Sequence, residues 1–94
     1  MTHLDNSESN FGEVSPAMAS ADVLFELGLM YCIGREVEQD YVTAHKWFNL
    51  AAVGGHAEAQ MCRADISEEM TAREIAEAQR RARQWLSQTQ RKAA

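Results

Sequence analysis

The chain has 94 residues, of which 46% are hydrophobic and 24% are charged, and its formal net charge is −5. This length is typical of one domain, and a single Pro with five Gly residues excludes a collagen-like or low-complexity chain. No segment approaches the roughly 20 apolar residues of a membrane span, and residues 1–10 lack the basic and apolar regions of a secretion signal. We therefore expect a cytoplasmic protein that does not contact a membrane.

The charges are unevenly distributed along the chain. Residues 1–70 contain twelve acidic and three basic side chains, a net charge of −9. Residues 71–94 contain two acidic and six basic side chains, a net charge of +4. An acidic body followed by a basic segment is therefore expected.

Residues 1–14 are polar and acidic, and after Met1 their only apolar side chains of any size are Leu4, Phe11 and Val14. The segment shows no periodicity and has too little apolar surface to bury. We expect it to be a flexible acidic tail in front of a helical domain that covers residues 15–88.

Ser15 and Pro16 predict the start of the first helix, because Ser caps first-turn amides and Pro suits the first helical position. Gly34 predicts its end as a C-terminal cap. The spacing of the apolar residues between them is helical and forms two adjacent stripes. The first stripe contains Leu24, Leu27, Gly28 and Tyr31, and the second contains Phe25, Leu29 and Cys32. A helix with two apolar stripes requires neighbours on two sides.

Asp40 is the predicted N-cap of a second helix, which Gly54 and Gly55 end. Its apolar stripe consists of Ala44, Trp47, Phe48, Ala51 and Ala52. The alanines allow another helix to approach closely, and the two aromatic residues supply most of the buried area.

A third helix is predicted from Ala57 to Glu69, with the apolar residues Ala59, Met61, Cys62 and Ile66. Thr71 and Glu74 form a capping-box pair that starts a fourth helix. The apolar face of the fourth helix contains Ile75, Ala78, Ala82, Trp85 and Leu86, and Glu77 is spaced to pair with Arg73 and Arg81 on the other face. Residues 89–94 are expected to fray.

The helices form two similar pairs. Ala21, Val23 and Phe25 match Ala57, Ala59 and Met61 at a spacing of 36, and Ala44, Trp47 and Phe48 match Ala82, Trp85 and Leu86 at a spacing of 38. Periods of this size are typical of helical repeat arrays.

The first pair resembles the Sel-one-like repeat (SLR) family, a relative of the tetratricopeptide repeat (TPR). The matching residues are Leu27-Gly28, Tyr31, Gly34, Val37, Asp40, Ala44, Trp47-Phe48, Ala51-Ala52 and Gly55, and His56 to Gln60 resembles the entry into a following repeat. This resemblance covers residues 21–60. It implies an all-α fold of two antiparallel helix-turn-helix repeats, a fragment of an α/α superhelix, and work as a scaffold or adaptor.

The sequence departs from the family pattern in two places. Glu36 stands where the loop of the family has a second glycine, so the turn is expected to differ slightly. The second pair has Arg63-Ala64 and Ser67 in place of Leu-Gly and Tyr, and it has no glycine loop. We interpret residues 57–88 as a degenerate capping repeat.

No motif in the sequence indicates a metal site or a catalytic site. Neither the three histidines (His3, His45, His56) nor the two cysteines (Cys32, Cys62) have metal-ligand spacing, and His45 is expected on the solvent side of its helix. We expect the cysteines to be free thiols that serve as small apolar residues. Catalytic and nucleotide-binding fingerprints are absent from the sequence. We therefore expect no enzyme, no metal and no cofactor.

The remaining hypothesis is an interaction module. Two repeats are fewer than an array usually needs to cover its apolar surface, so part of the first helix should remain exposed unless the tail or a partner covers it. We predict a protein or peptide partner bound through the first helix of each repeat, with Phe25, Leu29 and Arg63 in contact. Self-association into a homodimer is an alternative. A regulator that binds nucleic acid through Arg80, Arg81, Arg83, Arg91 and Lys92 is a second alternative, which the overall acidity disfavours.

Overall fold

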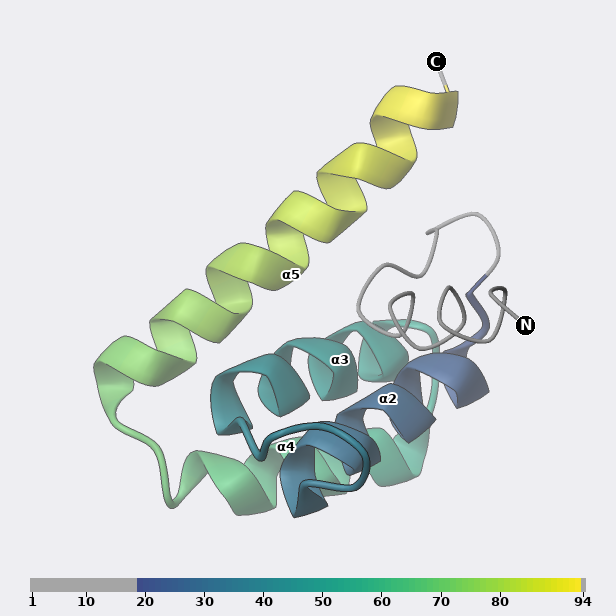
Figure 1. Ribbon diagram of the computed structural model, residues 1–94. Coiled ribbons are helices and arrows are strands. Elements are labelled where there is room, and N and C mark those ends of the chain that lie inside the picture. Colours follow the sequence, from purple (N-terminus) through teal and green to yellow (C-terminus); the bar gives the residue numbers. More distant parts are fainter. Residues whose placement is uncertain (1–18, 94) are drawn as a thin grey trace, which may run out of the picture.

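A computed structural model describes residues 19–93, and this part of the chain is entirely helical apart from its connections (Figure 1). The four helices are α2 (Ala21–Ile33), α3 (Tyr41–Val53), α4 (Ala57–Ser67) and α5 (Ala72–Ala93). The predicted all-α fold is confirmed. The tail expected over residues 1–14 lies outside the described residues. The helix that contains Leu24 was expected to start at residues 15 and 16, and that expectation is wrong, because Ser20 has an extended backbone and α2 begins at Ala21.

α2 begins and ends at residues whose side chains and backbones satisfy the exposed amides and carbonyls. Ser20 is its N-cap, and the Ser20 hydroxyl accepts a hydrogen bond from the Val23 amide at 3.2 Å. Gly34 is the C-cap with φ 76°, in the left-handed region that glycine adopts without a steric penalty. The predicted C-cap is therefore confirmed.

The other predicted caps are also present. The Asp40 carboxylate accepts hydrogen bonds from the Thr43 amide at 3.2 Å and from the Thr43 hydroxyl at 2.7 Å, which starts α3. Thr71 and Glu74 exchange side-chain-to-backbone hydrogen bonds of 2.9 and 3.1 Å before the first turn of α5. α5 then continues to Ala93, well past the end expected near residue 88.

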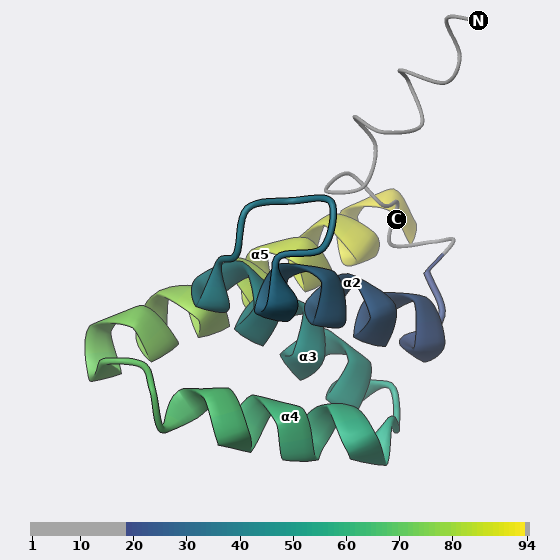
Figure 2. The same cartoon turned by 60° about the horizontal axis from the view of Figure 1, so that its bottom comes forward.

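α3 is the central element, and α2, α4 and α5 all pack directly against it (Figures 1 and 2). α4 and α5 leave their connecting loop in different directions and scarcely touch each other. The second helix pair is therefore not a packed hairpin of its own, because α4 buries only Ala59 and Ile66. Both of its helices depend on α3 for their packing.

The core is centred on two aromatic rings of α3. Trp47 is 1% exposed and Phe48 is fully buried. Trp85 of α5 is half-buried and meets Trp47 edge to face, with 5.8 Å between the ring centroids and an interplanar angle of 84°. Trp47 is therefore a core residue, as predicted, whereas Trp85 is only partly buried and packs against the core from outside.

A glycine sets the distance between α2 and α3. A Cβ atom added at Gly28 would lie 2.5 Å from Cε1 of Phe48, which is far inside van der Waals contact. The Phe48 ring therefore fills the space that a side chain at position 28 would need. This contact explains why a glycine is present in the middle of a helix, where it costs stability relative to alanine.

Candidate interaction surface

Phe25 is not the exposed anchor that the sequence predicted. Its side chain is 8% exposed, because the His56 ring stacks on it with 4.2 Å between centroids and Phe48 packs on it with 5.8 Å between centroids. His56 is also the N-cap of α4 and accepts a hydrogen bond from the Ala59 amide through Nδ1 at 3.1 Å. The start of α4 thus covers the ring that we expected to remain open.

The two other predicted contact residues are half-buried. Leu29 packs against the core while part of its side chain stays accessible. The Arg63 guanidinium donates a 2.9 Å hydrogen bond to Oδ1 of Asn49 on α3. Arg63 is therefore engaged with α3 rather than available on the side of α4 that faces α2.

α2 and α4 each have an exposed apolar side chain that the sequence analysis did not assign to the surface. Ile33 is 62% exposed and is four residues after Leu29, so it continues the same stripe of α2. Met61 of α4 is 66% exposed, although we expected it in the core. The i+4 spacing of Leu29 and Ile33 is the sequence signal that could have found this stripe.

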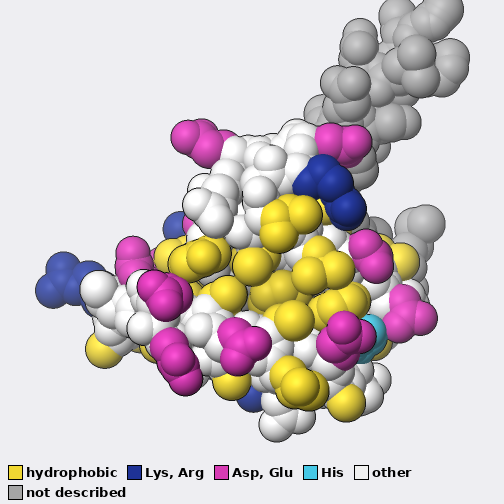
Figure 3. Space-filling model, turned by 90° about the horizontal axis from the view of Figure 1, so that it is seen from below, with side chains coloured by type: hydrophobic (Ala, Val, Ile, Leu, Met, Phe, Trp, Pro, Cys, Tyr) yellow, Lys and Arg dark blue, Asp and Glu magenta, His cyan; other side chains and the backbone are white. Residues whose placement is uncertain are grey.

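We call this surface the α2/α4 face. It consists of Leu29, Cys32 and Ile33 on α2, and Glu58, Met61, Cys62 and Asp65 on α4. Figure 3 views the molecule from the side on which α2 and α4 lie, and it shows hydrophobic side chains gathered in the middle with Asp and Glu side chains around them. The face is apolar at its centre and acidic at its edge.

The acidic edge is only partly neutralised. Glu26 lies 3.8 Å from the Arg35 guanidinium, and Asp22 lies 3.5 Å from Nε2 of His56, a contact that neutralises Asp22 only when the imidazole is protonated. Within residues 19–88, whose side chains the structure describes, Glu58 and Asp65 form no ion pair. These two carboxylates flank Cys62 along α4, because Glu58 is four residues before it and Asp65 is three residues after it.

The two thiols of the face are poor nucleophiles. Burial raises the pKa of Cys32, and burial followed by the nearby Glu58, Cys32 and Asp65 raises the pKa of Cys62. A raised pKa keeps a thiol protonated at neutral pH, and the thiolate is the reactive form. The thiols therefore serve as small apolar surface, and both are free, as the sequence predicted.

His45 was expected on the solvent side of α3, and that expectation is wrong. It is 2% exposed, and its Nε2 lies 3.0 Å from the Ser67 hydroxyl, which itself donates to the Arg63 carbonyl at 2.7 Å. Since the hydroxyl proton is used in this way, Nε2–H is the donor to Ser67. Burial and then the Arg63 guanidinium lower the pKa of His45. The imidazole is therefore a neutral structural group that joins α3 to α4.

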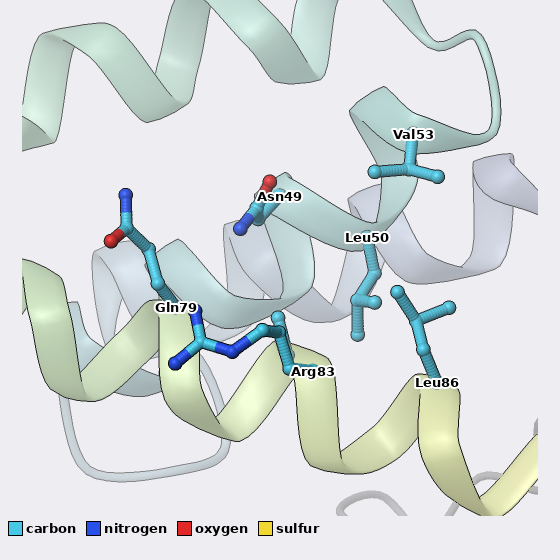
Figure 4. Close-up of a pocket in the computed structure, with 7 residues that line it drawn as sticks. Asn49, Leu50, Val53, Gln79, Arg83 and Leu86 are labelled. Carbon is cyan, nitrogen blue, oxygen red and sulfur yellow. The ribbon is translucent and has the colours of Figure 1, made fainter.

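A groove lies between α3 and α5, with a volume of about 410 Å³ (Figure 4). Leu50, Val53 and Leu86 form one end of it, and Asn49, Gln79 and Arg83 form the other. Val53 is 68% exposed and Leu86 is 37% exposed. This groove is separate from the α2/α4 face and has a cationic rather than an acidic polar end.

The described part of the chain contains no group of three or more metal-ligating side chains. Among those same residues, no helix is both long and apolar enough to cross a membrane. Comparison of the chain with protein-family models, with curated proteins and with solved structures finds no match.

Proposed function

We propose that this protein is an interaction module, a small adaptor or regulatory subunit that binds a protein partner through the α2/α4 face. The observation that carries the proposal is the exposure of Ile33 and Met61, 62% and 66%, beside the partly open Leu29, Cys32 and Cys62. Contiguous apolar side chains within a polar rim are typical of protein interaction sites. The proposed contact residues are therefore Leu29, Ile33 and Met61, and Phe25 and Arg63 act as supports for the face.

The resemblance to Sel-one-like repeats supports the same proposal. In that interpretation α2 and α3 form one repeat and α4 and α5 form a degenerate second one. The first helices of the two repeats, α2 and α4, then carry the partner-facing side chains. Several residues that carry the resemblance have physical roles in the structure. Gly34 and Asp40 cap helices, and Gly28 allows the close approach of the Phe48 ring.

The alternative of nucleic-acid binding through α5 has less support. Arg80 and Arg81 both form ion pairs with Glu77, and these hydrogen bonds, that of Arg80 first, lower the pKa of Glu77 to about 2. Two of the basic side chains of α5 are thus already paired with an acid of the same helix.

The proposal is tested with the double variant Ile33→Asp/Met61→Asp and the matched control Val53→Asp. Val53 is as exposed as the other two residues but lies in the groove between α3 and α5. All three sites are exposed, so the free energy of unfolding should change by only about 0.5 kcal/mol per site.

Each tagged protein is then used for affinity capture from cells that naturally express it, with quantitative mass spectrometry. We expect at least one protein whose capture falls more than tenfold with the double variant and is unchanged with the control. The proposal is wrong if no captured protein distinguishes the two variants. Light scattering of the purified protein at several concentrations separates a homodimer from a monomeric adaptor.

A further inference from the structure

We infer that the occupant of the α2/α4 face is a cationic amphipathic helix of another protein. This inference rests on the proposed function and specifies the chemistry of the partner. Its basis is the charge of the residues around the apolar centre, and the arrangement of the two helices that carry them.

The charge of the face is almost entirely negative. α2 contains Asp22 and Glu26 and no basic residue, and α4 contains Glu58 and Asp65 with Arg63 as its one cation. Arg63 is engaged by Asn49 of α3. Glu58 and Asp65, which flank Cys62, therefore have no cation of the described chain beside them, and a partner that supplies lysine or arginine would satisfy them.

The apolar centre has the form that a helix requires. α2 and α4 both pack against α3, and they approach each other where the Phe25 ring stacks on His56, the N-cap of α4, and where Cys32 acts electrostatically on Cys62. Leu29 and Ile33 are spaced by one helical turn on α2, and Met61 and Cys62 lie on α4. An amphipathic helix with apolar side chains at i, i+3 or i+4 and i+7 places one apolar stripe against such a surface. Its basic side chains then lie over the acidic edge.

The test uses two synthetic helical peptides as fluorescent probes. One has leucines at i, i+3, i+4 and i+7 positions and lysines elsewhere, and the other has glutamates in place of the lysines. Fluorescence anisotropy measures the Kd of each with the full-length chain. We expect the basic peptide to bind at least tenfold more tightly than the acidic one, and we expect 0.5 M NaCl to reduce this preference.

A matched pair of variants locates the charges that matter. Glu58→Gln/Asp65→Asn removes two negative charges from the face, and Gln84→Lys/Ser87→Lys adds two positive charges on the exposed side of α5. Both change the net charge by +2. We expect the first pair to weaken binding of the basic peptide about three- to tenfold, and the second pair to weaken it less than twofold. Equal losses in both variants would show only an effect of overall charge and would overturn the inference.

Two further outcomes separate this inference from the proposed function. If both peptides bind equally and Ile33→Asp/Met61→Asp abolishes both, the face binds partners but the inferred cationic chemistry is wrong. If the purified chain forms dimers at low salt that the basic peptide dissociates, the occupant is a second copy and the inference of a separate partner fails. Failure of the basic peptide to bind at all also overturns it.

Discussion

Glu36 holds a left-handed backbone conformation in the loop between α2 and α3, with φ 66°. This is a conformation that glycine adopts without a steric penalty, and the loop holds it with a glutamate instead. A side chain in this region costs about 1–2 kcal/mol, which glycine avoids.

Replacing Glu36 by glycine is therefore expected to stabilise the protein. We predict an increase of about 0.5–1 kcal/mol in the free energy of unfolding, measured by urea denaturation, after the entropy that glycine adds to the unfolded chain is subtracted. Glu38 lies in the same loop without a positive φ, so Glu38→Gly should be neutral or destabilising. Equal effects at both positions would contradict the conformational explanation.

His45 makes the stability of the fold depend on pH. Its pKa in the folded protein is lowered below the ordinary value of 6.5, so the unfolded chain binds the proton more readily. The contribution of the neutral imidazole is complete above about pH 6.5 and is lost as the pH falls below that value. The decrease should approach about 1.4 kcal/mol per pH unit until the folded-state pKa is reached.

Urea denaturation at pH 7.5, 6.5 and 5.5 tests this prediction. The pKa of Glu77 is also displaced, but it affects stability only near and below its ordinary value of 4.5, outside this range. His45→Gln removes the imidazole. The free energy of unfolding of this variant should be lower than that of the unmodified protein at pH 7.5, but it should change little between pH 7.5 and 5.5. If the free energy of unfolding of the variant falls with pH as steeply as that of the unmodified protein, His45 is not the cause.

At the scale of the elements, the contact between α2 and α3 depends on Gly28. Alanine normally stabilises a helix by 0.5–1 kcal/mol relative to glycine. At position 28 the added Cβ would overlap the buried Phe48 ring, so we expect Gly28→Ala to destabilise the protein by about 1–3 kcal/mol.

Thermal unfolding followed by circular dichroism measures this change. Gln60→Ala, at an exposed site of α4, is the control and should change stability by less than about 0.5 kcal/mol. A stabilised Gly28→Ala variant would mean that α2 and α3 are farther apart than described here.

The attachment of α5 to α3 depends on Trp85 more than on its neighbour Leu86. Trp85 is half-buried against Trp47, whereas Leu86 is 37% exposed. We predict that Trp85→Ala lowers the free energy of unfolding by about 2–3 kcal/mol, somewhat less than for a fully buried tryptophan, and that Leu86→Ala lowers it by less than about 1 kcal/mol. Urea denaturation of both variants checks this order, and a larger loss for Leu86→Ala would contradict it.

The helices and their ends were largely predictable from the sequence because they depend on local chemistry. Gly34, Asp40 and the Thr71–Glu74 pair act within one turn of their helices, and their roles are confirmed. The exposure of single side chains was less predictable, because it depends on other elements. Phe25 is covered by His56, the N-cap of α4, and His45 is covered through Ser67, the last residue of α4. Both covering residues come more than 20 positions later in the sequence.

The loose packing between α4 and α5 could not be predicted from the sequence either. The spacing of 36 to 38 residues between the two helix pairs suggested two equivalent hairpins. The few large apolar residues of α4 leave it attached mainly to α3, and the direction of α5 then depends on the Trp47–Trp85 contact. For this reason Met61 is exposed and forms part of the α2/α4 face.

At the scale of the whole molecule, the acidic and the basic residues are concentrated in different elements. The acidic residues of α2 and α4 surround the α2/α4 face, whereas the basic residues of the chain are concentrated in α5, which projects past the other helices (Figure 1). A partner approaching the face therefore meets a negative potential before it meets the apolar centre. This arrangement favours rapid association with a basic partner at low ionic strength.

Site-specific photo-crosslinking in the native cell tests the central claim most directly. A photoreactive amino acid is placed at position 33, in the α2/α4 face, and in a second protein at position 53, in the groove between α3 and α5. The account predicts a crosslinked product with another protein from position 33 and none from position 53. A product from position 53 alone, or none from either position, would contradict it.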